Sequence, residues 1–350
     1  MPEVESRSNG NTRTGARYAR QAVLGVIGQA GQQKLAESTV LVVGCGALGS
    51  TQAELLARAG ISKLILVDRD VLELHNLQRQ LLFDEQDVRE RLPKASAAAR
   101  RLRAVNSEIV IEAVVADVTA TNIVDLLRPA NLALDGTDNF ETRYLLNDAA
   151  VQAGKPWIYG GVLGTDGTVM AVRPGQGPCL RCIFPDPPDA HHLPTCETQG
   201  VLNTAVAWVA ALQVTEALKL LVGDPTAEFK LYALDVWRGS VTSVTIKRSE
   251  GCVCCAKRRF EFLDSERGSS STVFCGRNAV QVTPERKTSP DFAQLSERLK
   301  LLGTVTVNGL VLEFTCGVHR LVVFPDGRVL VMGTTDTAEA RSLVAKYIGS

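Results

Sequence analysis

The chain has 350 residues, 45% of them hydrophobic, which is enough for one large α/β domain and a smaller second one. The formal net charge is zero, so the charge balance gives no sign of nucleic acid or an anionic membrane as a partner. No apolar run is expected to reach the roughly 18 residues of a membrane span, and no signal peptide is evident. Nine cysteines without a secretion signal indicate thiols and metal rather than disulfides, so the cytoplasm is the expected compartment.

Residues 1–16 are polar and rich in Gly, Ser and Asn, which predicts a disordered leader. After them, apolar runs of strand length alternate with helical patterns. This alternation predicts the α/β class, with a Rossmann-like, doubly wound, mainly parallel sheet whose ligands bind beyond the carboxyl ends of the strands. The expected helices are 18–37, 50–60, 93–106, 122–130, 140–154 and 203–223, and the expected strands are 39–44, 63–68, 108–117, 132–139 (a strand running into a turn) and strands around a D-G turn within 156–175.

A Ser-rich stretch after residue 265 predicts a boundary between a first domain at 17–265 and a small α+β domain at 272–350. The second domain carries a helical pattern at 289–303, a hairpin around "FPDGRVLV" and a closing helix at 336–349. We expect it to dock a carrier or partner protein, or to brace a dimer.

The stretch "VLVVGCGALGS" joins a strand to a helix through a G-x-G-x-x-G turn made by Gly44, Gly46 and Gly49. Glycines let the backbone approach phosphates, and the N-terminus of the following helix favours negative charge. Asp68 ends the next strand, at the distance along the chain where an acid binds ribose hydroxyls. Up to this point NAD and ATP fit equally well.

The segment "DRDVLELHNLQRQ" favours ATP. A triphosphate that is attacked by an anion needs cations nearby, because nucleophile and target repel each other, whereas an NAD site needs little positive charge. Arg79 and Lys94 meet that need, although either alone is also typical of a solvated charged face. The polar residues expected at the site are Asp68, Asp70, Asn76, Arg79, Gln80 and, after Pro93, Lys94.

Two carboxylates in "LDGTDN", Asp135 and Asp138, lie at the end of another expected strand. A carboxylate there could hold Mg²⁺, which takes one or two carboxylates together with substrate phosphates. Asp-Gly and Asp-Asn are also ordinary turn formers, so a purely structural turn stays open.

Two C-x-x-C pairs, Cys179 with Cys182 and Cys252 with Cys255, form a four-thiolate set that favours tetrahedral Zn²⁺ in a structural role. The alternative is a set of free or redox-active thiols. Cys254 lies inside the second pair and could replace a ligand, so the assignment rests on spacing.

The remaining cysteines are single. Cys196 lies in the long Pro- and Cys-rich loop 178–200, where its thiol could be exposed and reactive. His191 and His192 are close enough in sequence to lower its pKa. Cys275 and Cys316, in the second domain, are interpreted as small buried hydrophobes.

Taken together, the motifs resemble those of the ThiF/MoeB/HesA superfamily, the bacterial relatives of ubiquitin-activating enzymes, over residues 17–256. They are "RYARQ", "GCGALG", "DRDVLELHNLQRQ", "PKA", "DGTDN" and the paired C-x-x-C motifs, in the family's order. The resemblance implies a homodimer that uses ATP to adenylate the C-terminal glycine of a small ubiquitin-like sulfur-carrier protein ending in Gly-Gly. Thiamine thiazole and molybdopterin synthesis are the implied pathways, with a cysteine desulfurase as candidate sulfur donor.

The resemblance also implies roles at the nucleotide. Asp68 and Asp70 would bind the ribose or position the nucleotide. Asn76, Arg79 and Lys94 would contact the phosphates. The scarcity of histidines suits this chemistry, because the carrier's terminal carboxylate is already ionised near pH 7 and needs no general base.

Three further residues receive roles by the same resemblance. Asp138 would hold Mg²⁺, Arg20 would reach into the site of the partner subunit, and Cys196 could bond covalently to the activated carrier. Two other classes of protein remain open from the residues alone. They are an NAD-dependent oxidoreductase and a non-catalytic adaptor of the same fold.

Overall fold

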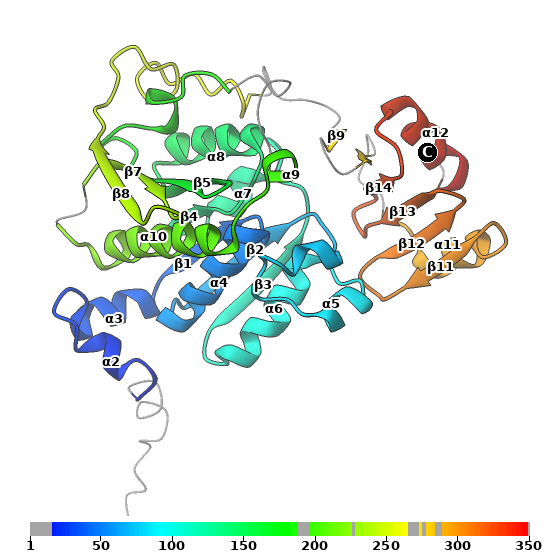
Figure 1. Ribbon diagram of the computed structural model, residues 1–350, viewed down its shortest axis with the longest axis horizontal. Coiled ribbons are helices and arrows are strands. Elements are labelled where there is room, and N and C mark those ends of the chain that lie inside the picture. Colours follow the sequence, from blue (N-terminus) through cyan, green and yellow to red (C-terminus); the bar gives the residue numbers. More distant parts are fainter. Residues whose placement is uncertain are drawn as a thin grey trace, which may run out of the picture. The chain divides into compact units, whose positions relative to one another are not determined.

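The computed structural model describes residues 16–187, 196–225, 228–264, 273–274, 278–283 and 289–348. The expected leader lies outside these residues except for Ala16. The chain forms two compact units (Figure 1). The first contains most of residues 1–266. The second contains residues 267–350 together with two stretches from earlier in the chain, 70–74 and 84–93.

An eight-stranded sheet forms the first unit, in the order β3-β2-β1-β4-β5-β6-β7-β8 (Figure 1). Neighbours from β3 to β5 run parallel, and neighbours from β5 to β8 run antiparallel. Because β1 and β4 are neighbours while β2 lies on the other side of β1, the strand order reverses between them, and a ligand is expected there. The α/β class predicted from the sequence is confirmed. The strands are β1 (Thr39–Val43), β2 (Lys63–Asp68), β3 (Val110–Val115), β4 (Leu132–Asp135), β5 (Trp157–Leu163), β6 (Asp166–Val172), β7 (Lys230–Asp235) and β8 (Ser240–Thr245).

Helices pack on the sheet in two groups. The contacts of α4, α6 and α10 with one another and with the strands form one group, and α7 packs with α8 in the other. The helix expected at 18–37 is instead two helices, because turns interrupt it at residues 23–27. The helices of this unit are α2 (Ala19–Ala22), α3 (Gly28–Ala36), α4 (Ala47–Ala59), α6 (Lys94–Val105), α7 (Ile123–Leu127), α8 (Phe140–Ala153), α9 (Cys196–Gln199) and α10 (Asn203–Val222).

Helix α10 is long and apolar enough to span a membrane by composition, which the sequence reading had not expected of any segment. Half of its most apolar window is buried inside the protein, and the helix packs against β5, β6 and α4. This packing is that of a core helix.

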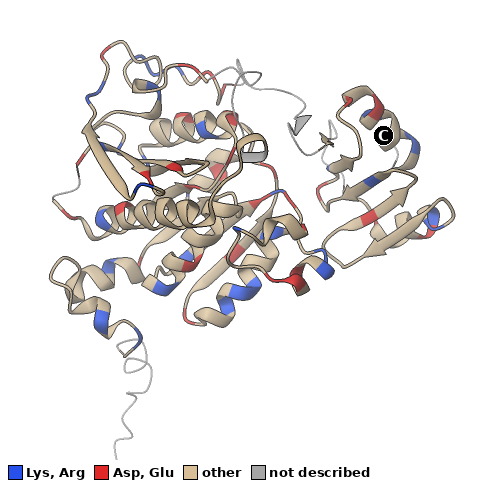
Figure 2. Cartoon of the chain, in the orientation of Figure 1, with Lys and Arg blue, Asp and Glu red and all other residues tan. Residues whose placement is uncertain are grey.

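Acidic and basic residues are interspersed along both units in the described part of the chain (Figure 2).

The turn between β5 and β6 is not the expected D-G turn. Leu163 pairs with Asp166, so the two connecting residues are Gly164 and Thr165, and Gly164 has a φ of +58°. Glycine adopts this left-handed conformation at little cost, which explains why the turn forms two positions earlier.

The second unit is built on a six-stranded antiparallel sheet in the order β11-β12-β13-β14-β10-β9. Two helices, α11 and α12, supply side chains to a separate hydrophobic core that includes Leu295, Phe314 and Ala340. Its elements are β9 (Val273–Phe274), β10 (Ala279–Val282), α11 (Phe292–Leu299), β11 (Thr304–Val307), β12 (Leu312–Cys316), β13 (His319–Val323), β14 (Val329–Met332) and α12 (Thr337–Tyr347), and the short helix α5 (Glu85–Arg89) belongs to the same unit.

Three glycines bring the turn after β1 against the turn after β4. A Cβ on Gly49 would lie 1.8 Å from the carbonyl oxygen of Gly44, and a Cβ on Gly136 would lie 2.5 Å from the same atom. Gly44 itself has a φ of +87°. By contrast, the nearest atoms to a Cβ on Gly46 are 3.9 Å away.

We therefore expect Gly49→Ala to lower the free energy of unfolding by about 3 kcal/mol, since backbone must move to admit the methyl group. Gly46→Ala is the matched control and should cost about 1 kcal/mol or less. Urea unfolding followed by circular dichroism measures both. Equal losses in the two variants would contradict the backbone packing described here.

Candidate nucleotide and metal sites

The N-terminus of α4 lies directly after the glycine turn and is open to an anion. Gly46 is the N-cap residue, no described side chain caps the helix, and its first turn contains no acidic residue. The orphan backbone N–H groups and the positive end of the helix dipole are therefore available to a phosphate. This supports the expected role of Gly44, Gly46 and Gly49.

Asp68 lies beside this turn. Its Oδ2 accepts a hydrogen bond of 2.6 Å from the backbone N–H of Cys45. Burial raises the pKa of the Cys45 thiol, the Asp68 carboxylate raises it further, and the Lys94 ammonium opposes them. One carboxylate and one ammonium thus act on the same buried position, so Asp68 and Lys94 both lie close to the turn.

Three of the polar residues predicted at the nucleotide are unusually buried for polar side chains. Asn76, Gln80 and Lys94 are only 2–3% exposed. Lys94 opens α6, and a buried ammonium normally needs anionic neighbours. Within the described part of the chain, the Gln80 side-chain oxygen is buried without a hydrogen-bond partner. A buried orphan atom close to the open helix end fits a site that is completed by a ligand.

Arg79 is half-buried, and its Nη1 donates to the carbonyl oxygen of His75 at 3.1 Å. Backbone N–H groups of Arg79 and Gln80 both donate to the carbonyl oxygen of Asn76, at 3.1 and 3.0 Å. The segment is therefore a compact turn rather than an extended loop. It holds Asn76, Arg79 and Gln80 within one helical turn of one another.

The two acids of "LDGTDN" have different surroundings. Asp135 is fully buried and bonds through Oδ2 to Arg143 Nε at 2.9 Å and through Oδ1 to the Thr137 hydroxyl at 2.7 Å. Asp138 is exposed. Because Asp135 is engaged within the protein, Asp138 is the carboxylate of this turn that can reach a solvated cation.

Arg143 was not singled out by the sequence reading, although it fixes this turn. It donates from Nη2 to the carbonyl oxygens of Thr137 at 2.7 Å and Gly160 at 3.1 Å, which ties the turn to β5. Burial raises the pKa of Asp135 while Arg143 lowers it. The sequence position of Arg143, eight residues after Asp135, does not distinguish it from a solvated arginine, because arginines in helices are normally exposed.

Buried glutamines hold the end of β4 from the other side. Gln52 Nε2, on α4, and Gln213 Nε2, on α10, both donate to the carbonyl oxygen of Asp135, at 2.8 and 2.9 Å. Gln52 Nε2 also donates to Gln213 Oε1 at 2.6 Å. Both lie in helical patterns that predicted only apolar packing, so their role could not be inferred from spacing.

The structure does not bring the other predicted residues together with this set. Asp70 is assigned to the second unit, and Arg20 is exposed on α2. Cys196 begins α9, but its side chain lies outside the described part. His191, His192 and Cys275 also lie outside the described residues, and Cys316 is half-buried at the end of β12.

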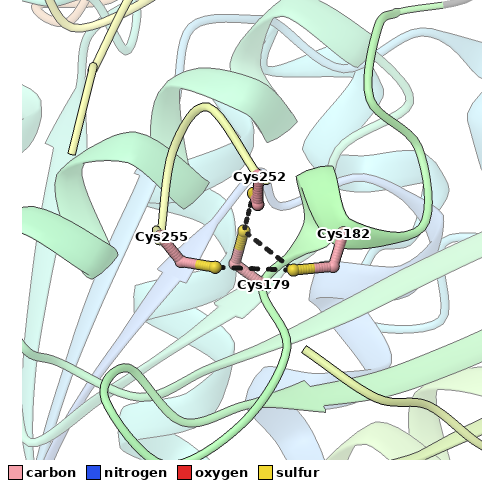
Figure 3. A group of neighbouring side chains, drawn as sticks. All are labelled: Cys179, Cys182, Cys252 and Cys255. Atoms are coloured by element: carbon pink, nitrogen blue, oxygen red, sulfur yellow. Dashed lines mark hydrogen bonds between the residues drawn. The ribbon is translucent and has the colours of Figure 1, made fainter. Parts of the chain in front are cut away.

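The two C-x-x-C pairs come together (Figure 3). Sulfur–sulfur distances are 4.0 Å for Cys179–Cys182, 3.5 Å for Cys179–Cys252 and 3.4 Å for Cys182–Cys255. Zinc–sulfur bonds of about 2.3 Å at tetrahedral angles place sulfurs about 3.8 Å apart, so the set is compatible with zinc. The Cys179 thiol lowers the pKa of Cys182 to about 6 by hydrogen bonding to it.

Cys254 has a hydrogen-bond partner outside the four-cysteine set. Its sulfur accepts a hydrogen bond of 3.2 Å from Asn147 Nδ2, and it is not among the four residues whose sulfurs gather within 4.8 Å. Asn147 Oδ1 accepts from the backbone N–H of Leu180, between the first pair of cysteines, at 2.9 Å. Asn147 therefore links α8 to both C-x-x-C segments.

This architecture defines a nucleotide-binding α/β protein with a four-cysteine cluster. The model of the ThiF family matches residues 18–254, and the chain belongs to this family.

Its similarity to individual proteins extends further along the chain. It is 42% identical over 337 residues to the sulfur carrier protein ThiS adenylyltransferase of Bacillus subtilis, covering 95% of this chain and 99% of that protein. The sulfur carrier protein adenylyltransferase of Thermus thermophilus is 38% identical over 269 residues, 74% of this chain and 96% of its own length. The structure of E. coli MccB with ATP superposes with a TM-score of 0.59 and 25% identity, over 68% of this chain and 74% of that chain.

We expect Cys179→Ser to lose the bound zinc and about 3 kcal/mol or more of unfolding free energy, because metal binding is coupled to folding. Cys254→Ser is the matched control and should keep about one zinc per chain. Elemental analysis of the purified variants measures the metal. Loss of zinc from Cys254→Ser but not from Cys179→Ser would overturn the ligand assignment.

Replacing Arg143 by Ala should destabilise the protein by about 3–5 kcal/mol near pH 7, because it leaves the Asp135 carboxylate buried without its cation. Without Arg143 the pKa of Asp135 rises further, since the one charge that lowers it is gone. Protonation then relieves the penalty, so the loss should shrink as pH falls and grow as pH rises. Urea unfolding at several pH values tests this, and a pH-independent loss would contradict it.

Proposed function

We propose that this protein is an ATP-dependent adenylyltransferase that activates the C-terminal glycine of a small ubiquitin-like sulfur-carrier protein. The observation that carries the proposal is the match to the ThiS adenylyltransferase of Bacillus subtilis, which extends over nearly the whole of both chains. The open N-terminus of α4 and the buried cation of Lys94 supply the chemistry that such a reaction needs. We infer a carrier ending in Gly-Gly, of the ThiS or MoaD type, and a place in thiamine thiazole or molybdopterin synthesis.

In this reaction a carboxylate oxygen of the carrier attacks the α-phosphorus of ATP. The bond from that phosphorus to the bridging oxygen breaks, and pyrophosphate leaves with the electron pair. The products are the carrier acyl-adenylate and pyrophosphate. No proton is removed from the nucleophile, because a terminal carboxyl group has a pKa near 3.5 and is ionised at neutral pH.

The chain's own residues then align the reactants and neutralise charge. The glycine turn and the N-terminus of α4 receive phosphate oxygens, while Lys94 and Arg79 offset the repulsion between triphosphate and carboxylate. Asn76 and Gln80 complete the polar surroundings of the nucleotide. The side-chain oxygen of Gln80 is buried without a hydrogen-bond partner within the described part of the chain. Asp68 and Asp70 are proposed to bind or position the ribose.

Asp138 is the residue that would hold Mg²⁺, because it is exposed while Asp135 is engaged by Arg143. When bound, Mg²⁺ neutralises phosphate charge and fixes the pyrophosphate leaving group. Arg143 keeps the turn that carries Asp138 attached to β5. The zinc that the four cysteines would hold takes no part in this chemistry. It would hold the two C-x-x-C segments together.

A cysteine with access to the adenylate would allow the acyl group to move from AMP to sulfur. We propose Cys196 for this role, with AMP as the leaving group and a thioester as the product. A cysteine desulfurase is the proposed source of sulfur for the carrier. We place the protein in the cytoplasm.

We further propose a homodimer in which Arg20 acts in the site of the partner subunit. The turn that follows Arg20 exposes Val23 and Val26 to 79% and 74%, and such adjacent exposed aliphatic residues indicate a surface that is covered in an assembly.

ATP–pyrophosphate exchange should appear only when Mg²⁺ and a carrier ending in Gly-Gly are both present. Asp138→Asn should lower the exchange rate at least about 100-fold, because charge neutralisation at phosphates contributes on the order of 3 kcal/mol or more to the barrier. Asp125→Asn, an exposed acid paired with Arg128, is the matched control and should exchange at the wild-type rate. Absence of exchange with every carrier in folded wild-type protein would favour a non-catalytic adaptor, and tight NAD binding would favour an oxidoreductase.

The trans role of Arg20 can be tested by complementation. Arg20→Ala and Lys94→Ala should each be inactive, but co-refolding or co-expression should restore about a quarter of the wild-type activity, since half of the dimers are mixed and each has one intact site. Light scattering gives the assembly size in parallel. Full activity of Arg20→Ala alone would place Arg20 outside any site, and no recovery from mixed dimers of inactive variants would place it in its own subunit's site.

A further inference from the structure

The four-cysteine set concentrates negative charge in one place. Zinc is ligated by thiolates, so the four cysteines together with one Zn²⁺ would carry two more negative charges than positive ones. Cys179, Cys252 and Cys255 are buried, and Cys182 is half-buried. Negative charge that is removed from water needs donors or cations close by. The residues that supply them help to determine how firmly a metal is held.

Two arginines that are close to the cysteines in sequence are engaged by an acidic side chain. Arg181, inside the first C-x-x-C pair, is bound to Glu261 at 3.0 Å. Arg259, which follows the second pair, lies 3.6 Å from the same carboxylate. Both guanidinium groups are therefore directed to Glu261, and the cation that serves the sulfurs has to come from another part of the chain.

Arg248, shortly after β8, is placed at the cysteines themselves. Its Nη2 donates to the carbonyl oxygen of Cys255 at 2.6 Å. Hydrogen bonding to Cys255 raises the pKa of the Arg248 guanidinium, and the charges of Cys182 and Cys252 add to this effect. The cation thus lies near three of the four cysteines. A guanidinium stays protonated in proteins, so its charge is present at every working pH.

The next residue in the chain supplies a donor to a sulfur. The backbone N–H of Ser249 donates to Cys182 Sγ at 3.5 Å, and the Ser249 carbonyl oxygen accepts from the N–H of Cys252 at 3.2 Å. A hydrogen bond to a charged acceptor is stronger than one between neutral groups, so this donor stabilises a thiolate. Because Cys182 is the half-buried member of the set, the donor lies at the sulfur that is nearest to solvent.

The β7–β8 hairpin brings Arg248 to the cysteines. The backbone N–H of Ile246 donates to the carbonyl oxygen of Phe229 at 2.9 Å, which extends the pairing of β7 and β8 by one residue at the end near the set. Arg238 lies in the turn at the opposite end of the hairpin and pairs there with Asp235. One hairpin therefore carries two exposed arginines, one at the cysteines and one far along the strands from them.

We propose that Arg248, together with the backbone N–H of Ser249, compensates the excess negative charge of the zinc–thiolate set and thereby slows the loss of the metal. Arg248 is a positioning residue, because it acts through Cys255 and does not ligate zinc. The proposal requires the four cysteines to bind zinc, but it does not rest on the proposed adenylation.

The test follows zinc loss from full-length, zinc-loaded protein at chelator concentrations where the rate no longer depends on the chelator. Arg248→Met should lose zinc about tenfold faster than the wild type, at the low end of the range for residues around a metal because Arg248 is exposed. Arg248→Lys keeps the charge and should stay within about threefold of the wild type. Arg238→Met is the matched control and should lose zinc at the wild-type rate.

Ionic strength separates charge compensation from a loss of structure. Salt screens exposed charges, and at about 1 M the Debye length is only about 3 Å. Zinc loss from the wild type and from Arg248→Lys should therefore accelerate as salt is added, while Arg248→Met should change little. The rates should converge at high salt. A constant ratio between Arg248→Met and the wild type at every salt concentration would contradict charge compensation.

Equal rates for Arg248→Met and the wild type would overturn the proposal. Equally fast loss from Arg248→Lys and Arg248→Met would do the same, because the bond to the carbonyl oxygen rather than the charge would then be responsible. Loss from Arg238→Met as fast as from Arg248→Met would show a general effect of removing a cation, and a wild-type protein that holds no zinc would remove the premise. Failure of the proposed adenylation would leave these rates and their interpretation unaffected.

Discussion

The close approach of two backbone turns determines the rest of the candidate site. Gly44, Gly49 and Gly136 pack against one another without side chains, so the ends of β1 and β4 lie together at the point where the strand order reverses. The N-terminus of α4 follows one of these turns without a side-chain cap, and Asp138 lies in the other. A larger residue at either contact would separate the turn proposed to receive phosphate from the turn proposed to hold the metal.

Buried polar side chains hold the end of β4 and its turn in place. Arg143, Gln52 and Gln213 all bond to the end of β4 or to its turn, and each donates to at least one backbone carbonyl oxygen there. Hydrogen bonds are directional, so they fix both the position and the orientation of the turn more closely than apolar packing does. Helix α8, which contains Arg143, also contains Asn147. The Asn147 side chain bonds to both C-x-x-C segments of the cysteine cluster.

The sequence was sufficient for the α/β class, most strand and helix positions of the sheet unit, the family and the gathering of the four cysteines. Periodicity and short motifs encode these features locally. It was not sufficient for Arg143, Gln52 or Gln213, because their partners are backbone atoms brought close only by the fold. The broken helix at 18–37 and the early turn at Gly164 were missed because turn geometry depends on a single residue's φ. The association of 70–74 and 84–93 with the C-terminal unit has no local signal.

The span of the Asn308 contact has a consequence for the order in which the protein is made. Asn308 donates to the carbonyl oxygen of Arg91, 217 residues earlier in the chain. During synthesis residues 84–93 leave the ribosome well before Asn308 exists, and domains generally fold from the N-terminus as they emerge. The large sheet can therefore form early, whereas residues 84–93 acquire their contact with Asn308 only when the final fifth of the chain has been translated. A nascent or truncated chain would hold a folded sheet while residues 84–93 still lack the Asn308 contact.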